Sequence, residues 1–143
     1  MTNEEYKNNF TKLVEILESL GVVVTLSPNG DNGFVPSTKT IIINSKQQIK
    51  SKYYTTLHEA GHFTLRSKPN FKERYSGIVV GEATTKSKRI EVLFEEPLAW
   101  HEAWNFADFH KLKTDRKDWN FYSTKYIGQY ALWVVNPNAF NCE

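Results

Sequence analysis

The hydrophobic positions of this 143-residue chain begin with helical spacing. Between residues 2 and 20, apolar side chains recur every three or four positions, which predicts an amphipathic helix with one buried stripe. The members of that stripe are Tyr6, Phe10, Leu13, Leu17 and Leu20. Thr2 and Glu5 have the spacing of a capping box at the start of this helix, and Gly21 is placed to end it.

The pattern then changes to strand-like runs. The β-branched run Val22–Leu26 predicts a strand, and Ser27–Gly33, which is rich in turn residues, predicts a loop. Thr40–Ile43 predicts a second strand. We expect it to pair with the first strand and with a short piece near Phe34 and Val35, so that a small sheet follows the N-terminal helix.

Helical spacing returns after the second strand. Ser45 and Gln48 again have capping-box spacing, so we expect a helix to begin there and to end before Pro69. Its core face is formed by Ile49, Tyr53, Leu57 and Ala60. Further apolar residues lie beside this face, so the helix is apolar over much of its surface and is predicted to be buried.

The remaining residues carry weaker patterns. Within residues 67–89, Ile78–Val80 predicts a short strand and Lys86–Arg89 a basic loop. Pro97–Leu112 predicts a third helix with its proline in the first turn, where proline is tolerated. Ser123–Val135 predicts a fourth helix, after which the tail is expected to be loose. The order of elements predicts an α+β fold with a buried central helix and further helices toward the C-terminus.

Composition limits the classes of protein that the chain can belong to. Residues 1–143 fit a single domain, and the 40% of hydrophobic residues can form its core. The net charge of +2 is too small to imply a nucleic-acid or membrane partner by itself. No apolar run approaches the roughly 18 residues of a membrane span, and the N-terminus lacks the order of a signal peptide. Cys142 is the only cysteine, which excludes an intrachain disulfide and favours a reducing, cytoplasmic setting.

The chemistry of the chain is concentrated in His58-Glu59-Ala60-Gly61-His62, an H-E-x-x-H motif inside the predicted central helix. Residues four apart lie on one helix face, so His58 and His62 can bind one metal ion together. Glu59 would then lie beside that ion, placed to take a proton from a bound water. The small Gly61 and the strand-like segment before the helix favour this interpretation over two ordinary helical histidines. The motif therefore predicts zinc-dependent hydrolysis.

A catalytic zinc ion usually has three protein ligands, so one ligand must come from outside the motif. The extension H-E-x-x-H-x-x-G-x-x-H is absent, which directs attention to the glutamates near the third helix. Glu96 shares its helical stripe with Trp100 and small residues, so it is expected to face inward and to complete the site. Glu95 and Glu102 remain open as alternatives. His101, beside tryptophan, is a weaker candidate.

These residues resemble the motif of the ImmA/IrrE-like metallopeptidases, a zincin group of bacteria and phages. The stretch HEAGHFTL at residues 58–65 matches their active-site helix, and Ile41–Asn44 is similar to the strand that leads into that helix. The resemblance implies a minimal zincin-like domain that binds Zn²⁺. The resemblance implies that His58, His62 and Glu96 are the zinc ligands and that Glu59 is the general base.

The resemblance covers roughly residues 35–107 and has two departures from the family pattern. The E-A-N-x-F-A stretch of the family is only echoed here, by Glu102–Ala107, and this second register keeps Glu102 open as a ligand. The usual Leu-Leu-Met-Pro ending is missing. The chain therefore resembles a divergent or phage-type form of the family.

The expected function is that of a zinc metallopeptidase that hydrolyses a protein or peptide substrate. One alternative is a non-catalytic zinc-binding interaction module, although metal binding alone does not require Glu59. Another is a DNA-associated protease resembling the SprT group, which also uses H-E-x-x-H. The basic clusters that could serve it are Lys86, Lys88, Arg89, Lys111, Lys113, Arg116 and Lys117. Such clusters are more typical of a solvated surface, so a nucleic-acid partner is not expected.

Overall fold

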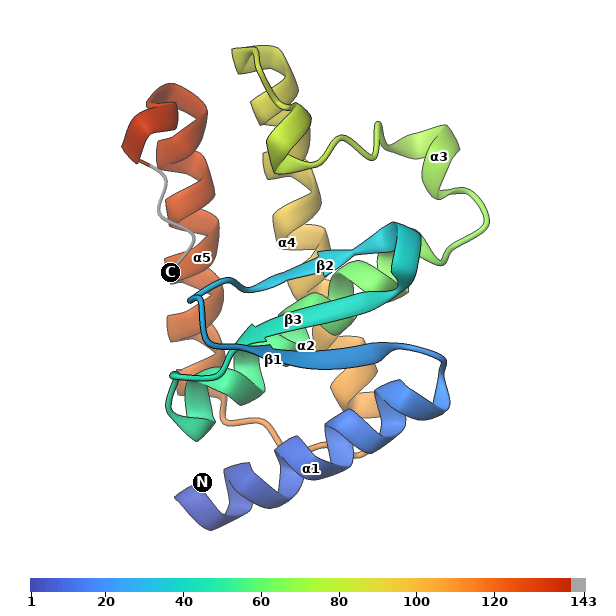
Figure 1. Cartoon of the computed structure of the whole chain (residues 1–143), viewed down its shortest axis with the longest axis vertical. Helices are drawn as coiled ribbons and strands as arrows, with labels where there is room; N and C mark the ends of the chain where they lie inside the picture. Colours follow the sequence, from blue (N-terminus) through green and yellow to red (C-terminus); the bar gives the residue numbers. More distant parts are fainter. Residues whose placement is uncertain (140–143) are drawn as a thin grey trace.

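A computed structural model of the chain describes residues 1–139, which form an α+β arrangement of five helices and a small mixed sheet (Figure 1). The α+β prediction is therefore confirmed. Cys142 and the last residues of the expected loose tail lie outside the described residues, while Pro137–Ala139 form a short 3₁₀ turn. Among the residues described, none of the helices combines the length and the apolar character needed to cross a membrane.

The first helix, α1, spans Asn3–Ser19, close to its predicted bounds. The hydroxyl of Thr2 accepts a hydrogen bond from the backbone N–H of Glu5 at 3.1 Å, which satisfies one of the free donors of the first turn. Gly21 has a φ of +83°, a left-handed conformation in which glycine ends a helix at little cost. Of the predicted stripe, Leu20 is 45% exposed because the helix has already ended there.

The sheet follows the predicted pairing. The strand β1 (Val23–Ser27) lies parallel to β3 (Thr40–Asn44), and β2 (Gly33–Val35) lies antiparallel to β3 on its other side. The order is therefore β1-β3-β2, with β3 in the centre. Ile41 and Ile43 point into the core from the central strand and are fully buried, as strand alternation requires.

The central helix, α2, spans Ile49–Arg66, and eleven of its residues are buried, as predicted. It packs against α1, against β3 and along α4, so it lies in the middle of the molecule (Figure 1). The capping box predicted at Ser45 does not form, because Gln48 is the N-cap residue and its side chain makes no capping bond. Instead, Gln47 accepts a hydrogen bond from the hydroxyl of Ser51 at 2.7 Å.

The helix α4 corrects two predictions. It spans Lys86–Phe109, so the segment Lys86–Arg89 is its first turn and not a loop, and Pro97 lies inside it and not at its start. Thr85 caps this helix by accepting from the backbone N–H of Lys88 at 3.2 Å. Proline has no N–H to donate, which costs one intrahelical hydrogen bond. Buried residues on both sides of Pro97 keep the helix continuous through that position.

The remaining elements also differ from their predictions. The short strand predicted at Ile78–Val80 is absent, because this part of the chain leads into a 3₁₀ turn at Val80–Glu82. This 3₁₀ turn comes after α3, a single helical turn at Phe71–Arg74. The last helix, α5, spans Arg116–Val135 and begins seven residues earlier than predicted. Its cap is Asp115, whose carboxylate accepts from the backbone N–H of Asp118 at 3.0 Å.

Candidate metal centre

The two histidines of the H-E-x-x-H motif lie one turn apart on α2 and point in the same direction. Their Nε2 atoms are 3.2 Å apart. His58 is 4% exposed and His62 is 9% exposed, so both imidazoles are removed from most of the solvent. The spacing of four residues has therefore placed two nitrogens that could bind a metal ion side by side in a buried position.

Glu96 approaches the histidines from α4. Its Oε2 lies 2.7 Å from Nε2 of His58, its Oε1 lies 3.1 Å from Nε2 of His62, and the residue is 2% exposed. His58, His62 and Glu96 form a buried group that could hold a metal ion, with ligand atoms within 4.8 Å of one another. Two ligands bound tetrahedrally at about 2.0–2.1 Å from an ion lie about 3.3 Å apart. The separations between the two Nε2 atoms (3.2 Å) and between His62 and Glu96 (3.1 Å) are close to this value, whereas the 2.7 Å between His58 and Glu96 is a hydrogen-bond distance and is shorter.

The electrostatics of the site favour a cation. Glu59, Glu95 and Glu96 bring three buried carboxylates into one region. Within residues 1–139, their one permanently charged partner is Arg66, which pairs with Glu95. Burial alone would lower the pKa of His62, but the charge of Glu96 and hydrogen bonds to Glu95 and Glu96 raise that pKa well above its usual value. A proton held on the imidazoles thus supplies positive charge that a metal ion would otherwise supply.

The same balance between burial and neighbouring charges shifts the pKa values of His58, Glu96 and Glu95. Burial would lower the pKa of His58, but the charge of Glu96 and hydrogen bonds to Glu59 and Glu96 raise it. Burial would raise the pKa of Glu96, whereas its two histidine neighbours hold that pKa far below its usual value. The pKa of Glu95 is also lowered, because His62 and Arg66 outweigh the effect of burial.

The ring of His58 is held by stacking. Trp100, one turn after Glu96 on α4, lies parallel to it with ring centroids 4.5 Å apart and an interplanar angle of 8°. Tyr126 of α5 lies farther out, with ring centroids 6.0 Å from His58 and an angle of 14°. The aromatic rings thus fix the plane of the imidazole and leave its Nε2 directed at Glu96.

Helices α2 and α4 come into close contact beside the site at Gly61. A Cβ atom at this position would lie 1.9 Å from the carbonyl oxygen of Ala99 and 3.0 Å from the Cβ of Ala103. Only glycine therefore permits this separation of the two helices. The separation in turn sets the distance between the histidines on α2 and Glu96 on α4.

Glu59 and the group that could hold a metal ion share one cavity of about 320 Å³. Its walls come from β2, α2, α4, α5 and the segment before α4, and they include Phe34, Val80, Val92 and Tyr130. Glu59 is 6% exposed, and its Oε1 lies 3.4 Å from Nδ1 of His58. A molecule in the cavity would therefore contact both the group that could hold a metal ion and a carboxylate.

The other predicted residues take different positions. Glu95 is buried beside His62, but its carboxylate meets Nδ1 and not Nε2. Glu102 forms an ion pair with Lys68 at 2.5 Å, at a second surface groove. His101 lies on the exposed side of α4, where its Nε2 is 3.4 Å from the amide nitrogen of Asn105. Of the three glutamates left open by the sequence, the structure brings Glu96 to both Nε2 atoms.

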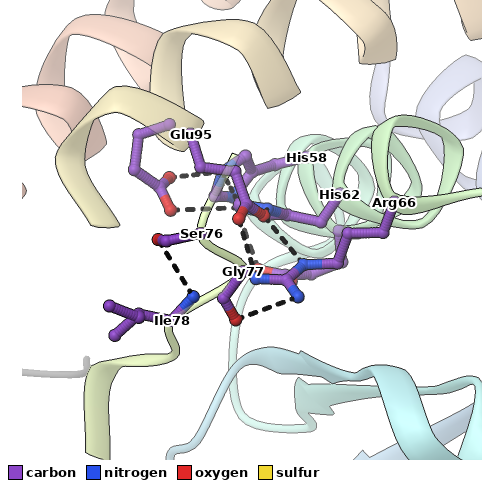
Figure 2. A network of polar contacts seen from close by, with 9 residues as sticks. His58, His62, Arg66, Ser76, Gly77, Ile78 and Glu95 are labelled. Atoms are coloured by element: carbon purple, nitrogen blue, oxygen red, sulfur yellow. Dashed lines mark hydrogen bonds and ion pairs between the residues drawn. The ribbon is translucent and has the colours of Figure 1, made fainter. Parts of the chain in front are cut away.

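Sequence reasoning missed Arg66 and Tyr126. Arg66 lies four residues after His62, so the spacing of His58, His62 and Arg66 already placed all three on one helix face. The guanidinium donates to Glu95 through Nε at 3.0 Å and Nη2 at 2.7 Å (Figure 2). Tyr126 carried no comparable signal, because its position depends on the packing of α5.

A scan against protein-family models, a search of curated proteins and a search of solved structures each returned no match to this chain.

Proposed function

We propose that the chain is a zinc-dependent peptidase of the zincin type, in which His58, His62 and Glu96 hold the ion. The observation that carries the proposal is the convergence of two imidazole Nε2 atoms and one buried carboxylate at a cavity that Glu59 also lines. The resemblance of HEAGH to the ImmA/IrrE-like motif points to the same activity. Two histidines and one carboxylate are also the ligand set of a hydrolytic zinc site.

A zinc ion bound there would lower the pKa of a water ligand and polarise the carbonyl of the scissile bond. Glu59 is the general base of the proposal. Its carboxylate accepts a proton from the attacking water and passes it to the nitrogen of the leaving amine as the C–N bond breaks. The products are a carboxylate and an amine, and Glu59 returns to its starting state. Glu96 would serve as a ligand of that ion, because its oxygens lie beside the Nε2 atoms of both histidines.

A peptide substrate is supported by the position of β2. This strand lies at one side of the sheet, bonded to β3, and residues 32–34 line the cavity. Peptides in an extended conformation commonly bind by adding a strand to such a sheet edge. The apolar walls of the cavity, which include Ile78 and Val92, suit an apolar side chain of the substrate.

The basic segments give little support to a DNA-associated protease. Lys86, Lys88 and Arg89 belong to the start of α4, and Arg89 donates to the backbone carbonyl of Val134 at 3.0 Å. One member of the cluster is therefore engaged within the protein. A peptidase acting on a protein or peptide is the function that the site supports best.

The proposal is tested by comparing zinc-loaded wild type with Glu59→Gln on a library of quenched fluorescent peptides. Wild type should cleave a subset of the library, and Glu59→Gln should bind zinc equally while losing at least about a hundredfold in rate. Glu91→Gln, an identical change at an exposed position of α4, is the matched control and should cleave at the wild-type rate. Equal zinc binding with no difference in cleavage between wild type and Glu59→Gln would overturn the catalytic proposal and leave a zinc-binding module.

A further inference from the structure

The outer nitrogen of His62 has a buried partner of its own. Nδ1 of His62 lies 2.5 Å from Oε2 of Glu95, while Nε2 of the same ring faces Glu96. Glu95 is 6% exposed, so a carboxylate and an imidazole meet there away from bulk water. A proton on Nδ1, donated to Glu95, leaves the lone pair of Nε2 free for a metal ion.

Glu95 is in turn held by Arg66. The guanidinium donates from Nε to Oε2 at 3.0 Å and from Nη2 to Oε1 at 2.7 Å, so both carboxylate oxygens are engaged. Two parallel bonds fix the plane of a carboxylate as well as its charge. Arg66 lies one turn beyond His62 on α2, whereas Glu95 lies on α4. The contact therefore connects the two helices that supply the three candidate ligands.

Arg66 also reaches the segment that forms one wall of the cavity. Its Nη1 donates to the backbone carbonyl of Gly77 at 3.4 Å, and its guanidinium carbon lies 5.1 Å from the ring centroid of Phe71. Residues 78–81, which follow Gly77, line the cavity. Figure 2 shows this continuous set of contacts from His62 through Glu95 and Arg66 to the 76–78 segment.

The two histidines are thus held in different ways. His58 is stacked on Trp100, and its Nδ1 lies 3.4 Å from the nearest Glu59 oxygen. His62 makes a shorter and charge-assisted contact, and its partner is itself anchored. An ion pair that only joined α2 to α4 would not need to include His62. The Nε2 atom of this imidazole faces a further carboxylate, that of Glu96.

We propose that Glu95 and Arg66 are a positioning pair for His62. Glu95 fixes the ring orientation and the position of its proton, and Arg66 fixes Glu95 together with the cavity wall at Gly77. The inference rests on the metal-binding part of the proposed function and not on peptide hydrolysis. It also explains why a second buried glutamate directly precedes Glu96 without serving as a ligand.

The first test measures the zinc dissociation constant by competition with a chromophoric chelator. Loss of an outer partner of a metal-ligating histidine typically weakens binding by about 10–100-fold, and we expect that loss for Glu95→Gln. Glu102→Gln is the matched control, because Glu102 also lies on α4 and pairs with Lys68, a residue just after α2. It should bind zinc as wild type does. Equal affinity of Glu95→Gln and wild type would overturn the positioning role.

A second readout separates positioning from a general loss of stability. In zinc-loaded protein labelled with ¹⁵N-histidine, the Nδ1 proton of His62 should resonate far downfield in wild type and in Glu102→Gln. In Glu95→Gln it should move upfield. Arg66→Lys keeps a positive charge but cannot reproduce the two parallel bonds to Glu95 together with the bond to Gly77. It should weaken zinc binding by a smaller factor than Glu95→Gln does. An unchanged resonance, or unchanged affinity in Arg66→Lys, would contradict the inference. If wild type itself fails to bind zinc, the proposed function fails instead.

Discussion

The close contact between α2 and α4 at Gly61 predicts that adding a single methyl group at this position disturbs both helices. In Gly61→Ala, the new Cβ would lie 1.9 Å from the carbonyl oxygen of Ala99 and 2.8 Å from its carbonyl carbon. Ordinary contact begins at 3.4 Å, so the oxygen is about 1.5 Å too close. Both atoms belong to a helix backbone and cannot rotate away as a side chain can. The two helices must therefore move apart.

This movement should reduce both stability and metal binding. Overpacking of a core typically costs about 1–3 kcal/mol, and alanine in place of a helical glycine returns about 0.5–1 kcal/mol. We expect a net destabilisation on the order of 1–2 kcal/mol, or more if the helices resist displacement. Glu96 lies three residues before Ala99 on α4, so it should withdraw from the histidines on α2. Zinc affinity should then fall by at least about tenfold, since ligand distances are constrained to within about 0.2 Å.

The assay is urea denaturation of the metal-free protein together with a zinc competition titration. Gly128→Ala is the matched control, because Gly128 lies in α5 and a Cβ there meets no atom within 4 Å. That variant should gain about 0.5–1 kcal/mol and keep the zinc affinity of wild type. If Gly61→Ala is as stable as wild type and binds zinc as tightly, the close approach of α2 and α4 is not what sets the site.

Two further predictions concern protonation and the buried tyrosines. The raised pKa of His62 stabilises the metal-free protein below its unfolded pKa of about 6.5, and this contribution is lost as pH rises through the folded pKa. The lowered pKa of Glu96 stabilises the protein above about pH 4.5, and this contribution is lost as the pH falls through the folded pKa. Thermal melts of the metal-free protein should therefore show the greatest stability near pH 5–6. Zinc competes with these protons, so the increase in melting temperature on adding zinc should grow from pH 6 to pH 8, and a constant increase would refute this reasoning. Tyr6→Phe removes a buried hydroxyl that donates to Asp118 at 2.5 Å and lies 2.9 Å from the hydroxyl of Tyr54. This change should lower the free energy of unfolding by about 1–3 kcal/mol without changing zinc affinity. A loss of zinc affinity would show that the Tyr6 hydrogen bonds are not independent of the His58, His62 and Glu96 group, and would contradict the reasoning.

The parts of the fold that the sequence predicted well are those with a regular hydrophobic period. The stripe of α1, the alternation that buries Ile41 and Ile43, and the apolar surface of α2 are each produced by local spacing. The inward orientation predicted for Glu96 followed from its position one turn before Trp100 and two turns before Ala103. These predictions needed no knowledge of distant contacts.

The start of α4 could not be inferred in the same way. Pro97 reads as a first-turn residue because proline is favoured there, but the helix runs from Lys86 and packs on both sides of the proline. The start of α5 was missed for a related reason. Its cap at Asp115 precedes residues whose burial depends on Tyr54, which stacks on Tyr122 with centroids 5.1 Å apart.

The buried contacts of Glu95 were hidden by the assumption that a helix buries one face. Glu95 and Glu96 are adjacent and point about 100° apart, yet both are buried because α2 supplies partners to each. Glu96 meets His58 and His62, whereas Glu95 meets His62 and Arg66. Arg66 is 29 residues earlier in the chain than Glu95. Only the packing of α2 on α4 brings the two together.

The central claim is that His58, His62 and Glu96 bind one metal ion, and anomalous X-ray diffraction tests it most directly. Data collected from zinc-loaded crystals on either side of the zinc absorption edge should give one strong anomalous peak. The proposed site predicts that peak within about 2.0–2.2 Å of Nε2 of both histidines and of a Glu96 carboxylate oxygen. A zinc-loaded crystal without a peak at this position, or with the peak bound by Glu95 or Glu102 in place of Glu96, would contradict the claim.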